Sequence, residues 1–262
     1  MLDFWFNLPT LALFAVLAVT YALIGTIIHL VTFRSPLRAA SSSLTGVAPQ
    51  IFAMVGLMFG LLTGFLAADI ADRNRQAARA VAAEAHALAD IRTLSIASVS
   101  DMTSIRAALQ EYLRSVIQDE WTRMSEFGRH AQTDAAYVHL LREVADPKIS
   151  EQSGSVVHAA LLRAVSEVGR ERSQRIAIST DPSNTIKWTT VLVLGVITLT
   201  AIGLVHVERP RAQITAMSLF IAAMVVALGL MAMQEWPFTG SLQVKPVPLQ
   251  ELFSIMMQSS PR

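Results

Sequence analysis

The chain has 262 residues, of which 53% are hydrophobic and 16% charged, and its formal net charge is +1. The apolar share lies above the usual range of soluble proteins and the charged share lies below it, while a charge so close to zero gives no reason to expect nucleic acid as a partner. The sequence contains no cysteine, which excludes disulfides, thiolate nucleophiles and thiolate metal ligands.

Apolar residues gather in four blocks, each long enough to cross the bilayer as a helix of about 20 residues. The blocks run over residues 9–33, 47–70, 188–207 and 212–236. The segment before the first block, MLDFWFNLP, has no Lys or Arg, whereas a secretory signal begins with a basic region. We therefore expect a retained membrane helix there, and an all-α fold with four transmembrane helices in a 2 + 2 arrangement.

The segment between the second and third blocks is rich in charge, and its apolar residues recur at helical spacing. The first of its helices is predicted to continue the second crossing without a break, from Met54 to Leu88. A second helix is expected with Ser100 as its N-cap, a third with Thr133 as its N-cap, and a fourth over 149–178. This divides the chain into two transmembrane helices (1–70), an extramembrane helical domain (71–186), two further transmembrane helices (187–236) and a C-terminal tail (237–262).

Four crossings place both termini and the helical domain on one side of the membrane. The flanking tryptophans agree with this topology, since an aromatic belt would place all of them at one interface: Trp5, Trp188 and Trp236. Basic residues in the two short loops favour a cytoplasmic location for those loops: Arg34, Arg38, Arg209 and Arg211. Basic residues also flank the membrane ends on the domain side, so the orientation stays open.

Several stretches in a fixed order resemble a bacterial membrane protein family called bestrophin-like. They are GLMFGLLTGFLAADIADRNRQAARAVAAEAHAL, YLRSVIQDEW, the pair Lys187-Trp188 and the tail EWPFTGSLQVKPVPL. The family usually has an aspartate just before that tail, where this chain has Glu235 and Trp236. The resemblance implies a multi-pass protein of the bacterial inner membrane. It also implies a remote likeness to bestrophins, which are pentameric anion channels whose second crossing lines the pore.

The second crossing carries two sets of candidate residues. Glycines four residues apart share one face and let helices approach closely: Gly56, Gly60 and Gly64. They suit either a contact between crossings or subunits around an axis, or ordinary packing within one subunit. The resemblance implies an apolar gate that closes by dewetting, for which the candidates are Ile51, Val55, Phe59 and Leu62; the alternative is that these side chains face lipid or the core.

Ionisable residues near the membrane ends form two further candidate groups. His29 and His206 lie inside the spans close to the short loops, where a group that titrates near neutral pH would make a pH-sensitive mouth. The alternative is hydrogen bonding to nearby backbone at the interface. Asp69, Lys187 and Glu235 lie near the helix exits on the domain side, and are expected to form either a charged mouth or interfacial ion pairs.

The sequence shows no motif of an enzyme, a metal site or a cofactor site. The histidines of the helical domain lack the HxxxH and HExxH spacings, and no glycine-rich phosphate loop is present. We therefore predict neither catalysis, nor a cofactor, nor a metal. The first functional hypothesis is a homo-oligomeric channel for a small ion, with the lipid bilayer and copies of itself as partners. The second is a non-conducting membrane-anchored sensor or scaffold, and a third is a subunit of a larger envelope complex.

Overall fold

The computed structural model describes residues 8–34, 48–98, 100–181, 185–240 and 242–258. All regular elements in these ranges are helices, so the all-α fold class is confirmed. The elements are α2 (Thr10–Arg34), α4 (Ala48–Ala97), α5 (Thr103–Ser115), the π-helix η1 (Val116–Glu120), α6 (Trp121–Phe127), α7 (Ala131–Val144), α8 (Pro147–Ser153), α9 (Ser155–Thr180), α10 (Thr185–Val205), α11 (Pro210–Ala232) and α12 (Val247–Gln258).

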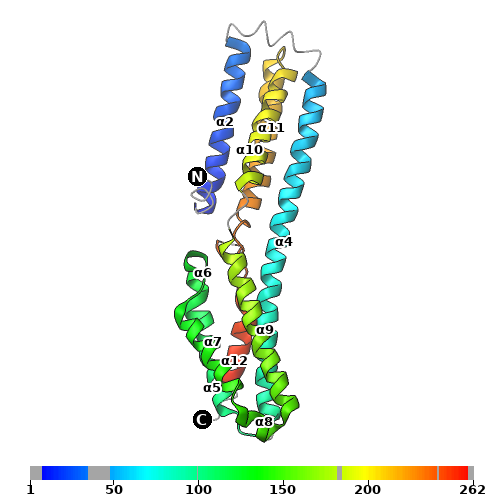
Figure 1. The fold of residues 1–262 in the computed structure, drawn as a ribbon. Coiled ribbons are helices and arrows are strands. Elements are labelled where there is room, and N and C mark those ends of the chain that lie inside the picture. The colour runs from blue at the N-terminus through cyan, green and yellow to red at the C-terminus, as the bar shows by residue number, and fades with distance from the viewer. Residues whose placement is uncertain (1–7, 35–47, 99, 182–184, 241, 259–262) are drawn as a thin grey trace. The chain divides into compact units, whose positions relative to one another are not determined.

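The chain forms two compact units (Figure 1). The membrane unit comprises Met1–Asp72 and Pro182–Glu235, and the helical unit comprises Arg73–Asp181 and Trp236–Arg262. Four stretches of the described chain are long and apolar enough to cross a membrane, and they correspond to α2, the first half of α4, α10 and α11. These agree with the four apolar blocks of the sequence.

Helices α2, α10 and α11 of the membrane unit pack against one another. Glycine makes this packing close: a Cβ atom built on Gly229 would lie 2.3 Å from Cε1 of Phe14, and one on Gly195 would lie 2.4 Å from Cε of Met224. The hydroxyl of Tyr21 donates to the carbonyl oxygen of Leu192 at 2.7 Å. In lipid, such close backbone approach and interhelical hydrogen bonds hold helices together.

Helix α4 is one element of 50 residues. It has no helix break between Asp69 and Asn74, so the continuity that the sequence predicted is confirmed. The division between the two units falls within this helix, at Asp72 and Arg73. Its composition changes there from apolar to charged and alanine-rich, which matches the change of unit.

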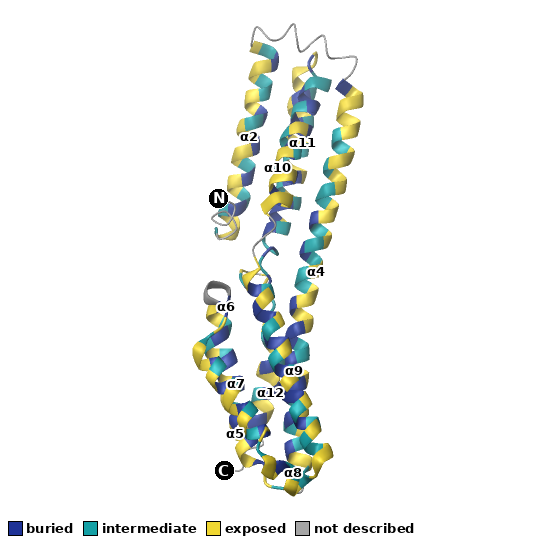
Figure 2. Ribbon diagram, in the orientation of Figure 1, coloured by how far each residue is buried: buried dark blue, intermediate teal, exposed yellow. Residues whose placement is uncertain are grey.

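The helical unit has a single apolar core to which the second half of α4, α5, η1, α7, α9 and α12 contribute. The contributing residues of α4 recur at helical spacing and are almost fully buried: Ala77, Val81, Leu88 and Ile91. Figure 2 shows these buried faces as dark blue strips on helices that are otherwise teal or yellow. From the sequence, residues 237–262 are predicted to form a C-terminal tail. In the structure this segment contains α12, which buries Leu249, Leu252 and Met256 in the core.

Both predicted N-caps are wrong. Helix α5 begins at Thr103, whose backbone N–H donates to Oδ1 of Asp101 at 2.9 Å, and Ser100 lies outside it. Helix α7 begins at Ala131, so Thr133 is inside it and buried, and its hydroxyl bonds that of Ser115 at 2.8 Å. The two failures differ in kind: at α5 the bond to Asp101 is local, whereas Thr133 bonds Ser115 of another helix.

The predicted fourth helix is two helices. Gly154 separates α8 from α9 with a φ of 85°, a backbone conformation that glycine adopts without the steric cost other residues bear. The predicted second helix extends further than expected, because the π turn η1 joins α5 to α6 without interruption. A π turn of this kind inserts one extra residue into a helix and is frequent at functional sites.

Candidate functional site

The first half of α4 presents an apolar face that no described helix of the membrane unit covers. Only 6% of its membrane-spanning window is buried, against 22% for α2 and for α11. Large side chains on this face are more than half exposed: Met54 69%, Leu57 74%, Leu61 55% and Phe65 60%. The yellow of this helix in Figure 2 shows the same exposure. We call these four residues the outer ridge of α4.

The three predicted packing glycines border the outer ridge and make no contact with another helix. A Cβ atom on Gly60 or Gly64 would meet nothing within 4 Å, and one on Gly56 would meet only Phe52 of the same helix. Together with Leu57, Leu61 and Phe65 they line an open apolar groove. The structure therefore shows no packing of these glycines within one subunit, in contrast to the tightly packed Gly195 and Gly229.

The gate candidates lie on the other flank of the outer ridge by helical spacing. Ile51 is 41% exposed, whereas Val55, Phe59 and Leu62 are half-buried. The Phe59 ring lies 5.5 Å from that of Phe220 on α11, centroid to centroid. The described part of α4 thus directs three of the four candidates partly toward its own unit.

The three residues of the expected charged mouth do not form one cluster. Nζ of Lys187 lies 2.8 Å from Oδ2 of Asp69, and both side chains are about 40% exposed. Glu235 is instead buried, and its Oε2 accepts a hydrogen bond from Nε1 of Trp188 at 2.8 Å. This tryptophan is fully buried, so it does not lie in a lipid-facing aromatic belt; Trp5 lies outside the described residues.

His29 belongs to a polar junction of three membrane helices. Its Nδ1 lies 2.7 Å from Oε1 of Gln213 on α11, and Nε2 of Gln213 donates to the carbonyl oxygen of Gly203 on α10 at 2.7 Å. Because the carbonyl can only accept, the amide oxygen of Gln213 faces His29, and Nδ1 of His29 must carry the hydrogen. Gln213 is fully buried and was not among the residues singled out from the sequence.

His206 makes a separate and simpler contact. Its Nδ1 lies 3.0 Å from the carbonyl oxygen of Ile202 one turn earlier on α10, so this nitrogen also carries a hydrogen. Both histidines therefore donate through Nδ1. They share a ring tautomer but no bonding partner.

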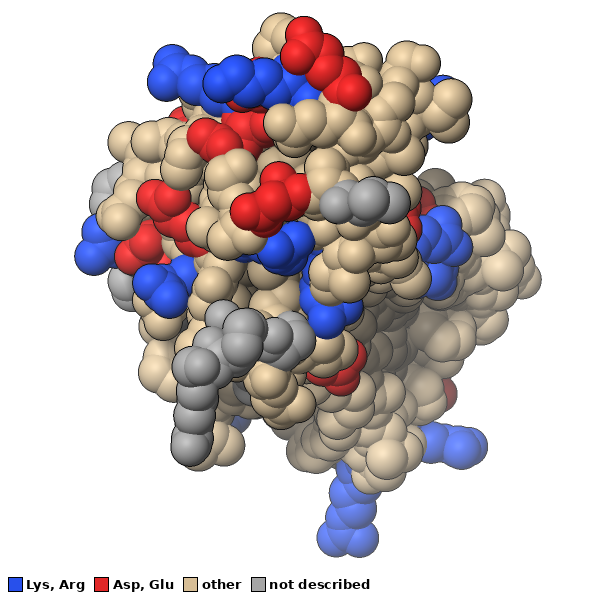
Figure 3. All heavy atoms as spheres, turned by 90° about the horizontal axis from the view of Figure 1, so that it is seen from below, with Lys and Arg blue, Asp and Glu red and all other residues tan. Residues whose placement is uncertain are grey.

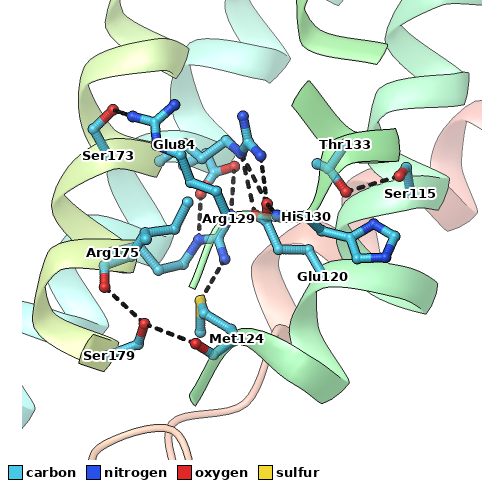
Figure 4. A network of polar contacts seen from close by, with 12 residues as sticks. Glu84, Ser115, Glu120, Met124, Arg129, His130, Thr133, Ser173, Arg175 and Ser179 are labelled. Carbon is cyan, nitrogen blue, oxygen red and sulfur yellow. Dashed lines mark hydrogen bonds and ion pairs between the residues drawn. The ribbon is translucent and has the colours of Figure 1, made fainter. Parts of the chain in front are cut away.

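A buried ionic network lies inside the helical unit (Figure 4). Arg175 on α9 donates to Glu84 of α4 from Nε at 2.7 Å and from Nη2 at 3.2 Å, and to Oε1 of Glu120 at 2.9 Å. Arg172, one turn earlier, also bonds Glu120, and reaches Oδ1 of Asp134 at 2.7 Å. The side chains of the two arginines and two glutamates are at most 3% exposed.

Aromatic and sulfur groups complete this network. The guanidinium of Arg175 lies 5.3 Å from the ring centroid of Trp121, a cation–π contact, and its Nη1 lies 2.9 Å from Sδ of Met124. The hydroxyl of Tyr112 donates to Glu84 at 2.7 Å. The ring of Phe238, in the tail motif PFTG, meets Trp121 edge-on at 5.6 Å.

The network shifts the pKa values of its members. Burial by itself would raise the pKa of Glu120, but hydrogen bonds and positive charge from Arg172 and Arg175 outweigh it and hold the pKa below its usual range. Burial, reinforced by the negative charge of Glu84, raises the pKa of the Tyr112 hydroxyl well above its usual value. Glu120 is therefore ionised at neutral pH, and Arg172 and Arg175, whose pKa values are raised against the effect of burial by the facing carboxylates, stay protonated.

Sequence analysis missed this network, although a signal exists. Along α9 the buried positions recur at spacings of three and four: Leu161, Val165, Val168, Arg172, Arg175 and Ser179. Two arginines thus occupy positions on an apolar stripe, where a charge is stable only with buried partners. The identity of those partners does not follow, because Glu84 and Arg175 are separated by 91 residues.

Comparisons with known proteins agree with this architecture. A family model described as Bestrophin-like domain matches residues 19–249. A bacterial bestrophin homolog from Klebsiella pneumoniae solved by Zn-SAD phasing superposes with a TM-score of 0.64 at 13% identity, covering 94% of this chain and 99% of the other. A mutated form of the Klebsiella protein superposes with a TM-score of 0.65 at 13% identity, covering 94% of this chain and 98% of the other. A protein described only as a membrane protein superposes with a TM-score of 0.68 at 13% identity, covering 94% of this chain and 97% of the other. Among curated proteins, none matches the chain.

Proposed function

Because the chain belongs to the bestrophin-like family, we propose that it is a subunit of a homo-oligomeric ion channel in the bacterial inner membrane. In this proposal the first half of α4 lines a path for small anions along the axis of the assembly. We propose no enzymatic activity.

The observation that carries the proposal is the uncovered face of α4. The outer ridge is more than half exposed and a Cβ atom on any of the three glycines would meet no other described helix, while α2, α10 and α11 pack closely together. Apolar side chains can face lipid without cost, but glycines spaced by four add little to a lipid-facing surface and are typical of helix contacts. In a ring of α4 helices from several subunits, the outer ridge and the three glycines would face the axis or the α4 helices of neighbouring subunits.

In this arrangement the path closes by dewetting at an apolar constriction. We propose Ile51, Val55, Phe59 and Leu62 as gate residues, with the outer ridge as the competing set. The pair Lys187–Asp69 lies at the exit on the domain side, and His29 and His206 are proposed to make the short-loop end sensitive to pH.

Ion flux through purified protein in liposomes tests this function. We expect chloride flux above that of empty liposomes between pH 5 and pH 8, and a larger flux for Phe59→Ser or Leu61→Ser, because a hydroxyl wets an apolar constriction. Leu219→Ser on α11 is the matched control, since Leu219 is 68% exposed on a helix outside the proposed path. The variant that increases flux identifies the face that forms the gate. A mass corresponding to one subunit in nanodiscs, or no flux at any pH, would contradict the proposal.

A second candidate function is a membrane-anchored sensor or scaffold that does not conduct. It is favoured by the lack of polar side chains on the exposed face of the first half of α4, where the outer ridge is entirely apolar. The polar residue Thr63 is half-buried, and its Oγ1 has no hydrogen-bond partner among the described residues. This alternative would be supported if the protein forms stable oligomers that pass no ion and if Phe59→Ser and Leu61→Ser also show no ion flux.

A further inference from the structure

An alanine-lined groove runs between α4 and α9 on the surface of the helical unit. Its volume is ≈ 630 Å³, and its floor consists of Ala83, Ala87, Ala160 and Ala164. Charged side chains form its rims, with His86 and Asp90 on α4 and with Arg163 and Glu167 on α9. A floor of this kind admits a helix at close range, provided that the helix itself presents small side chains.

Helix α7 of the same unit presents such a surface. Its exposed positions recur at spacings of four, three, four and three, as in the contact stripe of a coiled coil: Ala131, Ala135, Val138, Arg142 and Ala145. Val138 is 41% exposed. The opposite face of α7 is buried in the unit's own core through Ala136, Leu140 and Val144.

Groove and stripe both present small side chains, and each carries a charged group that can pair with the other. The stripe carries one base, Arg142, and the groove rim is mixed, with the acids Asp90 and Glu167 beside His86 and Arg163. Neither Arg142 nor Asp90 has an ion-pair partner among the described residues, whereas Glu167 already pairs with Arg170. Figure 3 shows acidic and basic side chains interspersed over the face it views, with no large area of one sign.

We propose that the groove between α4 and α9 binds the α7 stripe of a second copy of this chain, with Arg142 of one copy facing Asp90 of the other. Because the two surfaces differ, the contact is head-to-tail, and repeating it produces a ring when the rotation closes. This inference rests on the assembly part of the proposed function and is independent of conduction. It identifies the surfaces through which the helical units meet.

Disulfide cross-linking of the full-length protein in native membranes tests the inference without background, because the chain has no cysteine of its own. Ala135→Cys on the stripe is combined with Ala160→Cys on the groove floor, and the membranes are oxidised and run on non-reducing gels. We expect a ladder of dimers and higher multiples for the double variant and monomers for each single variant. The control pairs Ala135→Cys with Ser166→Cys, because Ser166 is exposed on α9 but outside the groove, and should stay monomeric.

Charge reversal provides a second and independent readout. Arg142→Glu in the double-cysteine background should lower the cross-linked fraction about fivefold, the effect expected for losing an exposed ion pair, and adding Asp90→Arg should restore it. Far-UV circular dichroism confirms that these exposed substitutions leave the helices intact.

Three outcomes would overturn the proposal. They are the absence of a ladder, dimers from Ala135→Cys alone, and cross-linked bands at masses that are not multiples of this chain. Ion flux without a ladder would refute the interface and keep the channel, whereas a ladder without flux would keep the interface and refute the channel.

Discussion

Removing the Arg175 guanidinium should strongly destabilise the helical unit. In Arg175→Met, Glu84 loses hydrogen bonds of 2.7 and 3.2 Å and Glu120 loses one of 2.9 Å. Glu120 keeps Arg172, but Glu84 is left as a fully buried carboxylate with only the Tyr112 hydroxyl as donor. Breaking a buried ion pair in this way costs about 3–5 kcal/mol, a large share of the ~5–15 kcal/mol by which domains are stable.

Guanidinium titration of the full chain in detergent, followed by circular dichroism, measures this loss through the midpoint and slope of unfolding. The matched control is Arg170→Met on the same helix, whose side chain is 67% exposed and whose loss should not shift the midpoint measurably. Adding Glu84→Leu to Arg175→Met removes the orphaned charge and should recover at least ~2 kcal/mol. If Arg175→Met is no less stable than the control, the network does not hold the unit together and this reasoning fails.

Three further predictions concern both units. Gly229→Ala should lower the thermal stability of the membrane unit by about 1–3 kcal/mol through overpacking against Phe14, whereas Gly60→Ala should leave the fold of a single subunit unchanged; equal effects would contradict the packing described. Gln213→Leu removes both hydrogen bonds of the three-helix junction and should cost about 1–2 kcal/mol, measured by thermal unfolding in detergent. The pKa of Glu120 is lower in the folded chain than its ordinary value of 4.5, so its contribution is fully present above 4.5 and is lost as pH falls below it toward the folded value; denaturation midpoints between pH 7 and pH 3 should fall more steeply for the native chain than for Glu120→Gln.

The membrane helices could be predicted from the sequence because lipid imposes a simple rule. Any span must be apolar and about 20 residues long, and uninterrupted apolar runs satisfy that rule by composition alone. The continuity of α4 was also predictable, since no proline or glycine lies between Asp69 and Asn74. Local chemistry predicted less well: Ser100 and Thr133 are residue types that often cap helices, yet α5 begins at Thr103 and α7 at Ala131.

The sites were harder to predict because they depend on partners that are distant in sequence. His29 is recognisable as an ionisable group in a span, but its partner Gln213 lies 184 residues further on. Glu235 and Lys187 look like members of one charged mouth, yet Glu235 is buried against Trp188 and Lys187 pairs with Asp69. Spacing within one helix reveals a face, whereas these pairings arise only when helices pack.

The composition of the helical unit has a consequence for biosynthesis. Its core needs Leu249, Leu252 and Met256 of α12, and these residues leave the ribosome only after α10 and α11 have been translated. After residue 181 has been translated, the core of the helical unit therefore stays incomplete until α10, α11 and α12 have also been made. Folding of this unit is thereby delayed until membrane insertion is nearly complete, and a transcript truncated before α12 would release a chain whose apolar core stays open to chaperones and proteases.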